Sequence, residues 1–211
     1  MKFVLFLFAA TIVAFVSGCS LFYSTPKVEP VKPIYNTIPH SLEEDYFHSP
    51  VGDVAGHYPK EWLQTNIEHV QELENLGFVY TNPERTWALT LEEIPGSADL
   101  RRRYEKDGLL AIAEESINLH RKKTPEFQIS RAPENFTQST MPFANYELTR
   151  GGADSTLHSR YVLFTTGIRF YEIGMSELTQ SARTTANNGY LANYELLQSV
   201  ISSLEGVPSG K

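Results

Sequence analysis

The chain has 211 residues, of which 41% are hydrophobic and 20% are charged, and this composition excludes wholesale disorder. The formal net charge of −7 argues against nucleic-acid binding through the overall field of the protein, so we expect no nucleic-acid partner. A single cysteine cannot form an internal disulfide, and a chain of this length favours one folded domain that needs no such bond.

The first 18 residues have the features of an export signal. Lys2 precedes Phe3–Val16, a run of 14 residues without charge. At 1.5 Å per residue a helix of this length spans roughly 21 Å, whereas a bilayer core is about 30 Å thick. We therefore expect residues 1–18 to be a cleaved signal peptide, with an uncleaved signal anchor as the alternative.

The run ends in Val16-Ser17-Gly18-Cys19, which resembles the bacterial lipobox of an aliphatic residue, two small residues and cysteine. This resemblance implies cleavage between Gly18 and Cys19, a diacylglyceryl group on the Cys19 thiol, and a further acyl chain such as palmitate on the new amino terminus. Two or more acyl chains give stable membrane attachment. Because Ser20 is not the aspartate that retains lipoproteins in the inner membrane, the resemblance implies an outer-membrane lipoprotein facing the periplasm. The alternative is an ordinary secretory signal with a chance cysteine.

Residues 19–44 are expected to be the lipidated amino terminus and a proline-rich tether. Four prolines disfavour a regular helix or central strand; they are Pro26, Pro30, Pro33 and Pro39. In an extended conformation about twenty residues at roughly 3.1 Å each reach up to about 60 Å. Alternatively, Ile34, Tyr35 and Ile38 would allow part of this segment to pack on the domain as an irregular arm.

Residues 45–205 are predicted to form one α+β domain, which begins with strands. A short strand is expected at 54–58. Two further runs alternate between apolar and polar residues around a turn at Asn82-Pro83, a pattern typical of a β-hairpin. Their apolar positions are Leu76, Phe78 and Tyr80 in the first run and Trp87, Leu89 and Leu91 in the second.

A helix is predicted after the hairpin, with Ser97 as its N-cap. One apolar face consists of Leu109, Ile112, Ala113 and Ile117. Gly108 weakens the centre of this segment by about 1 kcal/mol relative to alanine. A bend or a split is therefore expected there.

The last third of the domain is predicted to contain strands at 143–148, 160–165 and 168–175, the last two joined by a tight Thr166-Gly167 turn. Both parities of 161–164 are apolar, which indicates a strand covered on both faces. A terminal helix with Gly206 as its C′ residue follows, and 206–211 form a tail. The apolar face of this helix is expected to be Leu191, Tyr194, Leu197, Ile201 and Leu204. Strands joined by short turns pair antiparallel, so the order predicts an α+β sandwich, an antiparallel sheet between helices.

Three landmarks resemble those of PsbP-like domains. They are Tyr58-Pro59-x-x-Trp62, the strand Arg169-Phe170-Tyr171-Glu172-Ile173, and a closing helix with Ser199 and Ser202. The resemblance covers 45–205 and implies an antiparallel sheet between helices. It implies accessory, assembly or binding roles and transfers no catalytic residue. The region from Glu126 to Ser139 has no counterpart in this pattern.

Motifs of catalysis and metal binding are missing from the sequence, so no catalytic residue, no metal ligand and no cofactor is assigned. The histidines are His40, His48, His57, His69, His120 and His158, and none pairs with another at i, i+4. We expect them to be exposed or satisfied by neighbours. A nucleophile–base pair of Ser159 and His158 is disfavoured because adjacent strand residues point to opposite faces.

Other patterns allow two interpretations each. The clusters 101–103 and 121–123 are basic; they could contact anionic lipid or a polyanionic partner, or simply form a solvated helix surface. Asn135-Phe136-Thr137 matches a glycosylation sequon that a bacterial lipoprotein seldom uses. Five aromatic residues could line a ligand groove or form core, and core is expected; they are Tyr58, Trp62, Trp87, Phe170 and Tyr171.

These observations predict a membrane-anchored lipoprotein with a non-catalytic binding or assembly role in the bacterial envelope, and a protein partner there. The alternative is an envelope hydrolase or a small-ligand-binding protein with a site that the sequence does not reveal.

Overall fold

The computed structural model describes residues 42–65, 75–138, 141–151, 156–179 and 188–206, all within one compact unit of the chain. The strands in these ranges are β1 (Leu42–His48), β2 (Val54–Pro59), β3 (Leu63–Gln64), β4 (Leu76–Thr81), β5 (Trp87–Ile94), β6 (Gln128–Gln138), β7 (Met141–Arg150), β8 (Leu157–Thr165), β9 (Phe170–Glu177) and β10 (Glu205–Gly206). The helices are α2 (Ala98–Asp107), α3 (Leu109–Lys123) and α4 (Asn188–Ser202). None of these helices is both long enough and apolar enough to cross a bilayer.

The strands form two antiparallel sheets. The larger sheet has the order β3-β4-β5-β9-β8-β7-β6, and the smaller has the order β1-β2-β10. In the larger sheet β9 lies between two groups that are each continuous in sequence, β3 to β5 and β6 to β8. The β5–β9 pairing is long-range, since its partners Thr90 and Gly174 are 84 positions apart.

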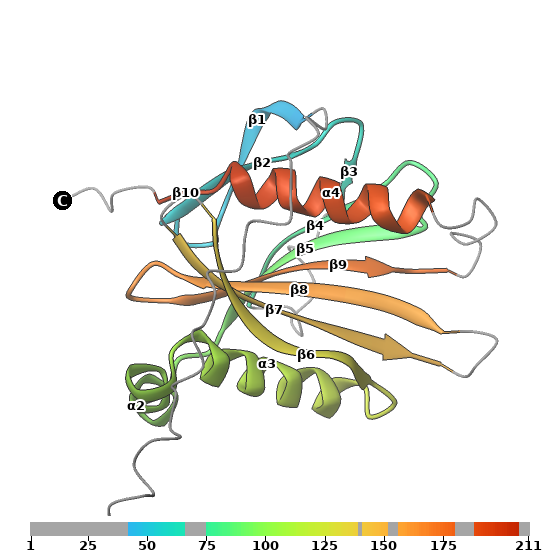
Figure 1. The fold of residues 1–211 in the computed structure, drawn as a ribbon. Coiled ribbons are helices and arrows are strands. Elements are labelled where there is room, and N and C mark those ends of the chain that lie inside the picture. Colours follow the sequence, from blue (N-terminus) through green and yellow to red (C-terminus); the bar gives the residue numbers. More distant parts are fainter. Residues whose placement is uncertain (1–41, 66–74, 139–140, 152–155, 180–187, 207–211) are drawn as a thin grey trace, which may run out of the picture. The chain divides into compact units, whose positions relative to one another are not determined.

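Helices cover both faces of the larger sheet (Figure 1). On one face, α4 and the smaller sheet enclose a core that includes Phe47, Ile173 and Leu197. On the other face, α2 and α3 enclose a second core that includes Ile112 and Leu163. The predicted α+β fold, an antiparallel sheet between helices, is therefore confirmed.

The predicted hairpin is present as β4 and β5, and Asn82 holds its turn. The backbone N–H groups of Thr86 and Trp87 donate to Asn82 Oδ1 at 2.8 and 2.9 Å. A side chain that accepts from its own turn is the usual reason for asparagine at such a position.

The predicted helix splits at Gly108. Leu100 N–H donates to Ser97 Oγ at 3.0 Å, so Ser97 caps α2 as expected. Gly108 ends α2 with φ of +66°, a conformation that an L side chain rarely adopts, and α3 starts at the next residue. This break lets α2 turn away while α3 continues along the sheet.

Several predicted boundaries are wrong. Strand pairing begins at Leu42, three positions before the expected start at 45. Ile168 and Arg169 belong to the β8–β9 turn, so β9 begins at Phe170. At the C-terminal end, α4 stops at Ser202, and Leu204 packs on the core beyond it. Gly206 is not a helix cap, because it pairs with Val54 in β10.

The sequence pattern missed β6 altogether. This strand lies at the edge of the larger sheet and pairs only with β7 among the strands described. Its register shifts between Ile129 and Arg131 and again between Arg131 and Glu134, around Pro133. Irregular pairing, a proline and charges are devices that prevent an edge strand from pairing with another chain.

Candidate functional site: a buried carboxylate and a pocket at the β8–β9 turn

A carboxylate lies in the core between the sheet and α3. Glu172, in β9, is 3% exposed. Tyr146 Oη of β7 donates to Glu172 Oε2 at 2.7 Å, and Ser116 Oγ of α3 donates to the same oxygen. His120 Nε2, one turn further along α3, lies 2.7 Å from Glu172 Oε1. Three side chains from two elements therefore converge on one carboxylate.

The charged forms of Glu172 and His120 stabilise each other. Burial alone would raise the pKa of Glu172, but the charge of His120 and the hydrogen bonds outweigh it, and the pKa lies below its ordinary value. Burial alone would lower the pKa of His120, but the Glu172 carboxylate raises it above the ordinary value. Glu92 adds to this rise, and Lys123 opposes it.

The geometry of this network indicates a structural tie. The His120 and Glu172 side chains are 13% and 4% exposed, so solvent hardly reaches them. The imidazole of His120 packs against the ring of Tyr161, with 4.3 Å between the two ring centroids. Burial raises the pKa of the Tyr161 phenol to about 12. Both carboxylate oxygens already accept hydrogen bonds, so the network fastens α3 to β7 and β9.

The pair should make stability depend on pH. His120, whose pKa is raised, contributes stability below its unfolded value of 6.5 and loses that contribution as pH rises through its folded pKa. Glu172, whose pKa is lowered, contributes stability above 4.5 and loses it as pH falls through its folded pKa. We expect urea titrations across pH to show the largest stability gap between wild type and His120→Gln from about 4.5 to 6.5. A gap that stays constant from pH 4 to 9 would contradict the charged pair.

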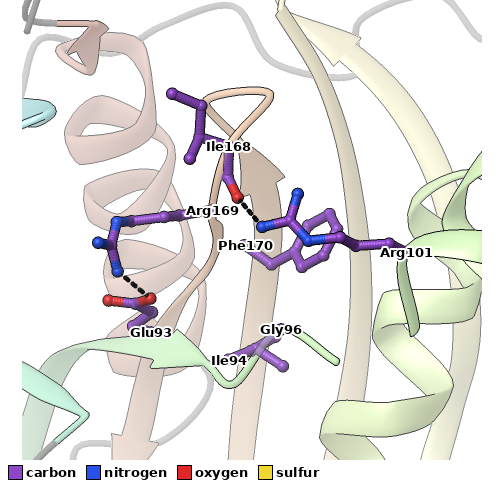
Figure 2. A pocket seen from close by; sticks show the side chains of 7 residues that line it. All are labelled: Glu93, Ile94, Gly96, Arg101, Ile168, Arg169 and Phe170. Carbon is purple, nitrogen blue, oxygen red and sulfur yellow. Dashed lines mark hydrogen bonds and ion pairs between the residues drawn. The ribbon is translucent and has the colours of Figure 1, made fainter. Parts of the chain in front are cut away.

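A surface pocket opens at the β8–β9 turn, at the end of the central strands where the β5–α2 connection also lies. Its volume is about 200 Å³. Figure 2 shows its walls: the turn on one side, the β5–α2 connection below, and the Arg101 side chain reaching across from α2. The lining residues are Glu93, Ile94, Gly96, Arg101, Ile168, Arg169 and Phe170.

Hydrogen bonds fix the turn beside this pocket. Arg101 Nη2 donates to the Ile168 carbonyl at 2.7 Å, and Arg169 pairs with Glu93 at 2.5 Å. Asp53, from the β1–β2 connection, accepts from Thr166 Oγ1 at 3.1 Å and from Tyr171 Oη at 2.6 Å. Burial would raise the pKa of Asp53, but these hydrogen bonds, with one from Ser49, keep it below its ordinary value. The turn is therefore held from three directions.

The aromatic residues do not form a groove. Trp87, Phe170 and Tyr171 are buried, and the half-buried Tyr58 and Trp62 pack against the α4 core. Phe170 belongs to the core under α3, whereas Tyr171 belongs to the core under α4. The expectation that these residues are mainly core is confirmed.

The other sequence-predicted positions are spread over the structure. Arg102 pairs with Asp99 at 3.1 Å, and Lys123 pairs with Glu92 at 2.6 Å, so both basic clusters are partly neutralised. Asn135 of the sequon lies in β6. His158 and Ser159 are neighbours in β8, and only Ser159 is buried. Within the described ranges, three or more His, Cys, Asp or Glu side chains nowhere group as metal ligands would. Gly18, Cys19, His40 and His69 lie outside the described residues.

Sequence reasoning missed the role of His120 and Glu172. A signal existed, because Glu172 interrupts the apolar strand Phe170-Tyr171-Glu172-Ile173, and a carboxylate in such a strand needs a partner. Ser116 and His120 stand at i and i+4 of one helix face. The partnership itself depends on how α3 packs on the sheet, which no local pattern reveals.

Comparison with known proteins supports the fold. No family model and no curated protein sequence matches the chain. A solution structure of cyanobacterial PsbP (CyanoP) from Synechocystis sp. PCC 6803 superposes with a TM-score of 0.58 at 12% identity, covering 85% of this chain and 100% of that one. A point mutant of the protein Mog1 superposes with a TM-score of 0.51 at 12% identity, covering 80% of this chain and 97% of that one. These similarities support a PsbP-like fold for the domain.

Proposed function

We propose that the chain is a lipoprotein, anchored through Cys19, whose folded domain has a non-catalytic binding or assembly role in the bacterial envelope. The observation that carries this proposal is Val16-Ser17-Gly18-Cys19, placed directly after the uncharged run Phe3–Val16. The first described strand starts at Leu42, beyond the four prolines that follow Cys19, and this spacing suits a domain held away from a membrane.

The surface at the β8–β9 turn supports a binding role. Ile168 is 64% exposed, the largest value among the big apolar side chains described. An apolar group that projects from a turn held by hydrogen bonds loses little entropy when a partner covers it. The domain therefore offers a preformed contact point in the aqueous compartment.

An enzymatic role has less support. Ligand pockets usually measure about 300–1,000 Å³, and the pocket at the turn measures about 200 Å³. Its acid, Glu93, is already paired with Arg169. Among the residues that the structure describes, the His–Glu pair with shifted pKa values, His120 and Glu172, does not line this pocket.

The anchor is tested by Cys19→Ala in a bacterial host that is supplied with radiolabelled palmitate. We expect the wild-type chain to incorporate label and to sediment with membranes, and the variant to incorporate none, because no thiol remains for alkylation. The variant should also keep its unprocessed mass. Ser17→Ala, which keeps a small residue at the cleavage site, is the control and should still be labelled. Equal labelling of wild type and Cys19→Ala would overturn the lipoprotein assignment.

The binding role is tested by affinity purification of the acylated full chain from detergent-solubilised membranes. We expect one protein to co-purify in a fixed ratio. Repeated recovery of no stoichiometric partner would overturn the binding role and leave the anchor assignment intact.

A further inference from the structure

One arginine of the first basic cluster differs from its neighbours. Arg102 pairs with Asp99, and Arg103 pairs with Glu114 and Glu115 at 3.0 and 3.3 Å. Arg101 forms no ion pair with any other described residue and uses one N–H for the Ile168 carbonyl. A guanidinium has five N–H donors, so most of the hydrogen-bonding capacity of Arg101 remains for a ligand.

The pocket therefore carries a net positive charge on an acidic protein. Arg169 is balanced by Glu93, and Arg101 supplies the remaining positive charge. The charge lies beside an apolar surface, because the carbonyl that Arg101 binds belongs to Ile168 (Figure 2). A ligand that matches both features has a carboxylate next to an apolar group.

Resting on the proposed binding role, we propose that this pocket recognises an acidic segment of a protein partner. A partner Asp or Glu binds the free N–H groups of Arg101, and an adjacent apolar side chain covers Ile168. The volume of about 200 Å³ suits a side chain. Charge complementarity selects this occupant, because an arginine fork binds a planar carboxylate through two parallel hydrogen bonds.

An anionic membrane surface fits this pocket less well. Polybasic lipid-binding segments combine about four to eight Lys or Arg residues. In this pocket, among the described residues, Arg101 alone offers a positive charge that is not paired with a carboxylate. Membrane contact is therefore an outcome that the experiment must distinguish from protein binding.

The test uses a photo-crosslinking apolar amino acid at position 168 of the full acylated chain in intact cells. Position 178 is the control, since Leu178 is also exposed, at 41%, and lies outside the pocket. We expect position 168, and not 178, to crosslink to a peptide of one protein with an Asp or Glu near the crosslinked residue. Arg101→Gln should lower the yield about tenfold or more, as loss of a charge-assisted hydrogen bond predicts.

Arg102→Gln is the matched variant, because it removes the same charge from the next position of α2, where the side chain is also exposed but does not line the pocket. It should change the yield by less than about twofold. Combining Arg101→Glu with an Asp→Lys or Glu→Lys change in the crosslinked segment should restore binding. The segment made as a synthetic peptide should bind the full chain, and its amide version should not.

Three results would overturn this proposal. They are crosslinks to phospholipid alone, crosslinks to a second copy of this chain, and equal losses for Arg101→Gln and Arg102→Gln. If a stoichiometric partner co-purifies equally with wild type and Arg101→Gln, the binding role stands and this site is wrong. If no partner co-purifies with any variant, the proposed binding role itself fails.

Discussion

Glu172→Ala should destabilise the domain by about 3–5 kcal/mol, the range measured when one partner of a buried ion pair is removed. The variant removes the carboxylate that the His120 imidazole, the Tyr146 hydroxyl and the Ser116 hydroxyl all contact in the core. Each buried donor that loses its partner costs about 1–3 kcal/mol. Urea denaturation followed by tryptophan fluorescence measures the loss, since Trp87 is buried in the α4 core.

Glu92→Gln is the matched control for this variant. Glu92 of β5 is the direct cross-strand partner of Glu172, but it forms its ion pair with Lys123, whose side chain is 57% exposed. An exposed ion pair contributes about 0–1 kcal/mol, so the control should stay within that range. If Glu172→Ala costs no more than Glu92→Gln, the network does not hold α3 on the sheet.

Gly174→Ala should destabilise the domain by about 1–3 kcal/mol through overpacking. A Cβ at this position would lie 2.8 Å from Thr90 Oγ1 and 2.9 Å from Cε1 of the Tyr161 ring. The Tyr161 ring cannot move away freely, because it packs against the rings of Tyr146 and His120, with centroid distances of 5.1 and 4.3 Å. Thermal or urea unfolding gives the change in stability.

The sign of this effect is informative. Where space is available, replacing glycine with alanine stabilises a protein by about 0.4–1 kcal/mol. Any stabilisation by Gly174→Ala would therefore show that the close contact is absent. Adding Thr90→Ala removes the nearest atom, so the double variant should recover part of the loss.

Local patterns predicted the parts of the fold that local interactions determine. The Asn82 turn, the Ser97 cap and the break at Gly108 each depend on a few neighbouring residues. The apolar run in β8 correctly indicated burial on both faces, because α3 and α4 cover opposite sides of that strand. Strand β6 was not predicted, because Pro133 and the charged residues of the strand interrupt the alternation of apolar and polar residues that indicates a strand.

The candidate site could not be predicted in the same way. The sequence of the three arginines at 101–103 does not reveal which of them lacks an acidic partner. The partners of Arg103 lie in α3, and they reach it only because the chain turns between α2 and α3. Likewise, Ile168 looked like a strand residue until the β8–β9 turn placed it at the surface. Interactions between distant segments decide which of several similar side chains remains available to a ligand.

The position of β9 has a consequence for the order of folding. The strands β3 to β5 and β6 to β8 can each assemble through neighbours in the chain, yet the two groups pair in the sheet only through β9, which lies between them. Closing a long loop costs entropy before the new contacts repay it, and such pairings slow folding. While the domain folds, the inner edges of both groups therefore stay open until β9, which ends at Glu177, pairs between them. Unpaired strand edges of this kind make a folding chain prone to aggregate.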